Sequence, residues 1–265
     1  MKKQLHLFAA DLGRAILSLK FLFSALAIAF FLFLSSYSYI HWDENGNSLD
    51  DVVTILEMAF SAFTNAVPAG TIALLPFATS YAEDMAENSA SFLVIRSGAT
   101  PYGVCKYIVS ILSGFLVMAC GILLYALFLS SHLPFFLGIY SSGADTGFEI
   151  FLYEGKPLLY LLCFAAAHGL SAAFCCGACV WISSIFPNRF AALAGPALLY
   201  LLLVRFDRGI LLLPLQYSTW NLVERTHGMG SALPTLGYKL LYISVFLIPM
   251  GIHALGNIKR RFRNA

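Results

Sequence analysis

Charged residues are scarce in this chain, and several catalytic and nucleotide-binding patterns are missing from it. Only 11% of the 265 residues are charged, against about a quarter in an average soluble domain. The phosphate-binding pattern G-x-x-x-x-G-K-[ST] does not occur, because the one Gly-Lys pair, Gly155-Lys156, is followed by Pro157. The zinc-protease pattern H-E-x-x-H and the nucleophile elbow of hydrolases are also missing. We therefore expect no enzyme activity in this chain, and basic residues are too few to predict nucleic-acid binding.

Apolar residues, in contrast, are in large excess. They make up 59% of the chain, and the mean hydropathy is +0.78. A chain with this balance has too few polar groups to cover a surface that faces water. The composition predicts an integral membrane protein.

Long apolar runs divide the chain into membrane spans. A span needs about 20 mostly apolar residues to cross about 30 Å of hydrocarbon, and it must be helical because lipid offers backbone groups no partners. The second run is the weakest, since Asn65, Pro68, Gly70 and Pro76 interrupt it. We predict an all-α fold of six spans in a single domain, residues 1–265, with the spans at 21–40, 56–80, 104–130, 157–186, 188–206 and 237–258.

Lysine and arginine predict the orientation. With six spans both termini lie on one side, and that side receives eleven of the sixteen basic residues. These are Lys2, Lys3, Arg14, Lys20, Arg96, Lys106, Arg189, Lys259, Arg260, Arg261 and Arg263. Ten of the fourteen acidic residues fall on the opposite side. Because basic residues concentrate on the cytoplasmic side, both termini are predicted to be cytoplasmic.

Two segments outside the spans have amphipathic or interrupted patterns. Residues 1–20 carry apolar residues at helical spacing among bases, which predicts a helix lying along the inner membrane interface. A plain cytoplasmic extension of the first span is the alternative. Residues 207–236 contain an apolar stretch that is too short to cross and is split by Pro214, which predicts a re-entrant outer segment before the sixth span.

The connection between the second and third spans is the most polar long stretch of the chain. We predict a helix over 82–97, with apolar residues Met85, Phe92 and Leu93 on one side and the acids opposite. The apolar side is expected to pack on the membrane domain, and the acids are expected to face the cytosol or a partner. Gly98 suits the end of that helix, and Thr100-Pro101 suits the cap and first turn of the next span. A solvated loop is the alternative.

This arrangement resembles the permease subunits of ABC transporters of the type-2 exporter family, in particular the six-span permeases common in Firmicutes. The matching residues are YAED (81–84), FLVIRS (92–97) and Lys106. The interfacial first helix and the segment before span six also match that layout. Family members often have glycine after the acids, where this chain has Asn88.

The resemblance implies that 82–97 is a coupling helix, seated on a separate ATPase subunit. Glu83, Asp84, Glu87, Phe92 and Arg96 would then couple the two subunits. It further implies two ATPase copies that hold ATP and magnesium, a second permease copy or a related permease, and a bacterial plasma membrane. Apolar spans rich in aromatic residues indicate a lipophilic or amphipathic substrate such as a peptide, drug or lipid. A six-span secondary carrier or a membrane scaffold without an ATPase is the alternative.

Residues inside the predicted spans include a histidine, six cysteines and a glutamate that are candidates for chemistry. His168, Cys175 and Cys179 share one predicted helix face, but His168 lies roughly 10 Å along the axis from Cys175, too far to share one metal ion. Helix packing is the favoured role for these cysteines over a metal or redox site. Disulfides are not expected, because none of the six cysteines falls in an outer loop.

Glu57 lies near the outer end of the predicted second span. It either has a function inside the membrane or simply reaches the membrane interface.

Overall fold

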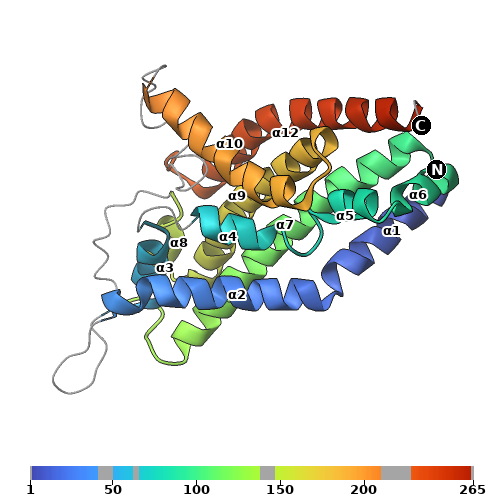
Figure 1. Ribbon diagram of the computed structural model, residues 1–265. Helices are drawn as coiled ribbons and strands as arrows, with labels where there is room; N and C mark the ends of the chain where they lie inside the picture. The colour runs from blue at the N-terminus through green and yellow to red at the C-terminus, as the bar shows by residue number, and fades with distance from the viewer. Residues whose placement is uncertain (1, 41–49, 62–65, 138–146, 210–227, 264–265) are drawn as a thin grey trace.

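The structure of the chain is a computed structural model that describes residues 2–40, 50–61, 66–137, 147–209 and 228–263. Among these residues there are helices and turns and no β-strand (Figure 1). In chain order the elements are α1 (Lys2–Ile16), α2 (Leu19–Ser36), η1 (Tyr37–Tyr39), α3 (Val52–Ser61), α4 (Ala66–Ala73), α5 (Ser80–Ala86), α6 (Ser89–Ser97), α7 (Ala99–Ser130), α8 (Ile150–Tyr153), α9 (Pro157–Ile185), α10 (Arg189–Gly209) and α12 (Ala232–Arg263).

Five described helices are long and apolar enough to cross a membrane. They are Leu19–Tyr39, Ala99–Ser130, Pro157–Ile185, Arg189–Asp207 and Ala232–Arg263. Many of their large apolar side chains point outward, among them Phe23 and Phe30 on α2 and Leu202 on α10, which are more than half exposed. Such a surface suits lipid rather than water. The chain is an all-helical, multi-pass membrane protein, and each of five predicted spans corresponds to one of these helices.

The predicted second span, 56–80, is not one continuous helix. α4 ends at Ala73, and residues 74–79 form turns before α5 begins at Ser80. Pro76 lies in these turns, where its ring and missing N–H prevent the helix from continuing. In Figure 1, α3, α4 and α5 still follow one another toward the end of the bundle that holds both termini.

Cysteine side chains of α9 lie against this interrupted path. The Cys176 thiol donates to the carbonyl of Ala73 at 3.5 Å, and the Cys179 thiol donates to the carbonyl of Ala78 at 3.4 Å. Both carbonyls lie where a helix has stopped, so neither has a full set of helical partners. A thiol is a weak donor, but at membrane depth it replaces water as the partner of a carbonyl.

α9 is the most buried of the long helices, and α7, α9 and α12 pack closely against one another where glycine faces a neighbour. A Cβ atom on Gly114 of α7 would lie only 2.2 Å from the Cys176 sulfur. A Cβ on Gly251 of α12 would lie 2.8 Å from the ring of Tyr107, whose hydroxyl donates to the carbonyl of Leu247 at 2.6 Å. These contacts fix three long helices to one another, as small residues commonly do in membranes.

The helix expected over 1–20 is present as α1, and it is separate from α2. The chain bends at residues 17–18, and the hydroxyl of Ser18 accepts a hydrogen bond from the first turn of α2. The two helices therefore do not form one continuous extension of the first span. Ala15 packs against Phe77 and Val109. Both termini lie at the same end of the bundle, beside α6 (Figure 1).

The single helix predicted over 82–97 is instead two short helices, α5 and α6. Asn88 separates them with a φ of 57° in the left-handed region, which asparagine adopts more readily than most residues. Gly98 ends α6 as predicted, with a φ of 86°. It is also the N-cap of α7, a position that the sequence assigned to Thr100.

The re-entrant segment predicted at 207–236 lies mostly outside the described residues. Its first residues, up to Gly209, continue α10, and its last residues, from Ala232, already belong to α12. The predicted sixth span therefore begins five residues earlier than expected, at 232 rather than 237.

Candidate functional site

Asp84 of α5 is held in a mostly buried ion pair. Lys106 of α7 places its Nζ atom 2.9 Å from Asp84 Oδ2, and the Tyr102 hydroxyl donates to the same oxygen at 2.7 Å. The Lys106 side chain is 5% exposed, and its ammonium also lies 4.8 Å from the centre of the Phe77 ring. Because a buried charge needs a partner, Asp84 and Lys106 depend on each other.

The other two acids of this segment contact different helices. Glu83 accepts a hydrogen bond from Thr79 Oγ1 at 3.0 Å and lies 3.6 Å from the ammonium of Lys20 on α2. Glu87, just after α5, pairs with Arg189 of α10 at 2.9 Å. These two pairs are largely exposed, so each contributes little to stability. Glu83, Asp84 and Glu87 thus contact α2, α7 and α10, and we refer to the three acids as the α5 anchor.

Asp11 of α1 lies close to this anchor and is almost fully buried. Burial raises the pKa of its carboxyl, while the charges of Lys106 and Arg14 act in the opposite direction. Asp84 raises the pKa of Asp11 further, because a second anion nearby disfavours ionisation. The interior beside α5 therefore holds two carboxyl groups around the single ammonium of Lys106.

α6 differs from α5 because it presents apolar side chains outward. Phe92 is 72% exposed and Ile95 is 83% exposed, and Arg96 beside them is also exposed. Positions 92, 95 and 96 fall on one side of a helix. We call these three residues the α6 face. It lies outside every candidate span, at the end of the bundle where the two termini lie (Figure 1).

The exposure of Phe92 corrects the expectation that it packs on the bundle. The prediction placed Met85, Phe92 and Leu93 on one side of a continuous helix. Because the helix breaks at Asn88, residues before and after it no longer share one side. Met85 and Leu93 do pack inward, in a cluster around Tyr102. The sequence thus predicted two of the three inward contacts, and the third residue points away.

The sequence also missed the partners of the three acids. The sequence places Lys106 at the start of the predicted third span. A base at this depth needs a counter-charge, so an ion pair with one of the preceding acids could have been inferred. Lys20 and Arg189 carried no such signal, because they lie 63 and 102 residues from their partners Glu83 and Glu87. The structure brings Glu83, Asp84 and Glu87 into intramolecular pairs and leaves Phe92 and Arg96 facing outward.

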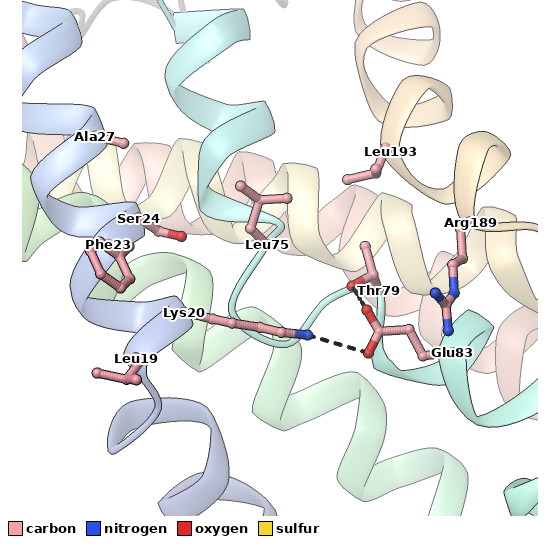
Figure 2. Close-up of a pocket in the computed structure, with 10 residues that line it drawn as sticks. All are labelled: Leu19, Lys20, Phe23, Ser24, Ala27, Leu75, Thr79, Glu83, Arg189 and Leu193. Carbon is pink, nitrogen blue, oxygen red and sulfur yellow. Dashed lines mark hydrogen bonds and ion pairs between the residues drawn. The ribbon is translucent and has the colours of Figure 1, made fainter. Parts of the chain in front are cut away.

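A groove of about 500 Å³ lies beside the α5 anchor, between α2 and α10 (Figure 2). Its lining is mostly apolar, and it has charged side chains at one end. We call it the α2–α10 groove. Its lining residues are Leu19, Lys20, Phe23, Ser24, Ala27, Leu75, Thr79, Glu83, Arg189 and Leu193.

A second polar group lies buried inside the bundle. The hydroxyl of Tyr160 donates to Glu57, which is only 5% exposed and so does not reach the surface. About one turn further along α3 and two turns further along α9, the His168 ring stacks on Phe60 with ring centres 3.8 Å apart. Lys239 of α12 is also buried, with only 2% of its surface exposed. Buried ionisable groups of this kind mark functional positions in many membrane proteins.

The cysteines serve packing in the described helices. All six are free, and Cys175 lies against Gly70, where a Cβ would come within 3.1 Å of its sulfur. Within the described residues no group of three or more His, Cys, Asp or Glu side chains is placed to hold a metal ion.

Comparisons with protein-family models, with curated proteins and with solved structures found no match to this chain.

Proposed function

We propose that this chain is the membrane-spanning subunit of an ATP-driven exporter, which docks on a separate ATPase through α6. The observation that carries the proposal is the α6 face. Two large apolar side chains and an arginine are exposed on a short helix that lies outside the spans. Exposed apolar groups in contact with water are typical of protein interaction sites, and arginine is enriched in them.

The α5 anchor supports a coupling role for α6. α5 is joined to α2, α7 and α10 by ion pairs, and α6 continues directly into α7 across Gly98. A force applied at Phe92 would therefore pass to several long helices rather than to one loop. In this proposal Glu83, Asp84 and Glu87 position α6 and transmit movement, while Phe92 and Arg96 contact the ATPase.

We further propose that the segmented path α3–α4–α5 is a sixth crossing. Six crossings place both termini on one side, in agreement with their position in Figure 1. The distribution of basic residues then makes that side cytoplasmic, in a bacterial plasma membrane, with α1 along the inner interface. Two such chains, or this chain and a related one, would enclose the path of a lipophilic or amphipathic substrate, and two ATPase subunits would hold ATP and magnesium.

The test is whether ATPase binding depends on the α6 face. The tagged chain is purified from its native membrane, and Mg-ATP hydrolysis in the purified material is measured for wild type, Phe92→Asp and Phe92→Leu. Wild type and Phe92→Leu should retain hydrolysis, and Phe92→Asp should lose it while keeping its thermal stability. If wild type carries no hydrolysis, or if Phe92→Asp retains it, the proposal is wrong.

The two buried ionisable residues Glu57 and Lys239 favour a second candidate, a secondary carrier. Carriers place ionisable residues inside the membrane, where protonation or ion binding drives the cycle. This candidate predicts that the chain transports substrate in liposomes without nucleotide, driven by a proton or sodium gradient. It also predicts that Phe92→Asp transports as well as wild type, whereas Glu57→Gln does not.

A further inference from the structure

The α2–α10 groove differs from its surroundings because its chemistry changes along its length. Figure 2 shows Ala27 and Leu193 toward one end and Lys20 and Glu83 at the other, with Leu75 between them. The polar end lies at the first turn of α2, on the side of the molecule where the termini lie. An amphipathic molecule lying along a membrane span has this same order, with its polar part at the interface.

The groove opens to the side of the bundle rather than to its interior. Phe23 on the α2 wall is 64% exposed, and the neighbouring α2 and α10 residues Leu22 and Phe190 are also exposed. Both walls belong to helices that are long and apolar enough to span a membrane. Whatever occupies the groove therefore enters from the lipid phase.

The polar end carries both signs of charge. Lys20 comes from the α2 wall and Arg189 from the α10 wall, and Glu83 lies at the floor between them (Figure 2). The contact between Lys20 and Glu83 is long, at 3.6 Å, and both cations remain more than half exposed. Weak, exposed pairs of this kind can be exchanged for contacts with a ligand at small cost.

We propose that the α2–α10 groove binds one zwitterionic phospholipid with a primary ammonium, of the phosphatidylethanolamine type. Its phosphate lies between Lys20 and Arg189, its ammonium donates to Glu83, and an acyl chain lies along Phe23, Ala27, Leu75 and Leu193. Charge complementarity selects this headgroup, because a lipid with only a phosphate leaves Glu83 facing an anion. The proposal does not rest on the exporter function, since it requires neither an ATPase nor transport.

The first experiment measures which lipid the groove prefers. The purified chain is mixed with phosphatidylethanolamine or phosphatidylglycerol of matched acyl chains, and bound lipid is counted by native mass spectrometry. We expect one tightly bound phosphatidylethanolamine, with about tenfold preference over phosphatidylglycerol, because its ammonium brings a positive charge to Glu83 whereas the glycerol hydroxyls are neutral donors. Equal binding of the two lipids by the wild-type chain would overturn the proposal.

Charge variants then test each contact. Glu83→Gln keeps the shape of the side chain and should abolish the preference between the two lipids while phosphate binding persists. Lys20→Met combined with Arg189→Met should weaken the binding of both lipids about tenfold or more. Lys259→Met, an exposed base on α12 outside the groove, is the matched control and should bind as wild type does. Equal losses in the control and in the double variant would show a general electrostatic effect and refute the site.

Bulky substitutions in the apolar part of the groove test the same site without changing any charge. Ala27→Trp should fill the groove and displace the lipid, whereas Leu26→Trp, next to it on α2 and outside the lining, should not. If Ala27→Trp retains the lipid, the bound molecule lies elsewhere. If the wild-type chain is a dimer with no bound lipid, a second copy covers the groove and the proposal is wrong.

Discussion

α5 and α6 are neighbouring short helices with opposite surroundings. Every acid of the α5 anchor contacts a base of another helix, and Asp84 does so in a mostly buried environment. α6 packs only one side, through Ala90 and Leu93, and leaves Phe92 and Ile95 exposed. One residue, Asn88, separates these two environments. The difference indicates that the first helix holds the segment in place and the second is available to a partner.

The largest expected effect comes from breaking the buried pair of the α5 anchor. Lys106→Met leaves the Asp84 carboxylate without its counter-charge, which typically destabilises a protein by about 3–5 kcal/mol. Thermal unfolding of the purified chain in detergent measures the loss. Adding Asp84→Asn to Lys106→Met should recover much of it, because the uncompensated charge is then gone. If Lys106→Met is as stable as variants of the α6 face, α5 is not an anchor.

A smaller effect is expected at the junction of the two helices. Asn88→Val forces a β-branched residue into the left-handed region, which costs about 1–2 kcal/mol. Asn88→Gly is the matched control and should be close to neutral, because glycine adopts this backbone freely. The same unfolding measurement distinguishes them. Equal stability of the two variants would mean that the turn between α5 and α6 adopts another conformation.

A pH dependence is expected from Asp11, beside the anchor. Burial raises the pKa of Asp11 above its ordinary value of 3.8, so the folded protein binds this proton more tightly than the unfolded chain does. Its contribution to stability is therefore greatest below pH 3.8 and decreases as pH rises through the folded pKa. Asp11→Asn should remove that decrease. Melting temperatures should favour the variant at pH 7 and converge with wild type near pH 4, and a constant difference would contradict this reasoning.

The smallest effect is expected for the exposed pair of the anchor. Glu87→Gln removes one charge from a pair in which both side chains are more than half exposed, so stability should change by less than about 0.5 kcal/mol. The wild-type contribution should also weaken with added salt. A large loss would mean that Glu87 acts in the way that Asp84 does, and the distinction between buried and exposed contacts of α5 would fail.

Much of the architecture was predictable because membrane spans are encoded locally. Runs of apolar residues located five long helices, and the amphipathic pattern located α1. Residues 56–80 were predicted as one helical span, which is wrong, although Pro76 already marked a point where a helix stops. The position of this segment along the bundle depends on contacts with α9, and such distant contacts leave no periodic pattern in the sequence.

The candidate site was harder to predict than the fold. Gly98 and the acids of α5 were located correctly, since a helix stop and a charge cluster are visible in the sequence. The outward direction of Phe92 was not, because it depends on the backbone of Asn88. A helical pattern assumes an unbroken register, and one left-handed residue is enough to invalidate it.

The thiol contacts of α9 have a consequence for the order of assembly during synthesis. Cys176 and Cys179 follow their partner carbonyls by 103 and 101 residues. At about 5–20 residues per second, a ribosome needs about 5–20 s to reach these cysteines after it has made the interrupted segment. The segment from α4 to α5 therefore emerges long before its partner and reaches its final hydrogen-bonded state only when α9 arrives. α7 is thus made before the segment from α4 to α5 has reached its final contacts.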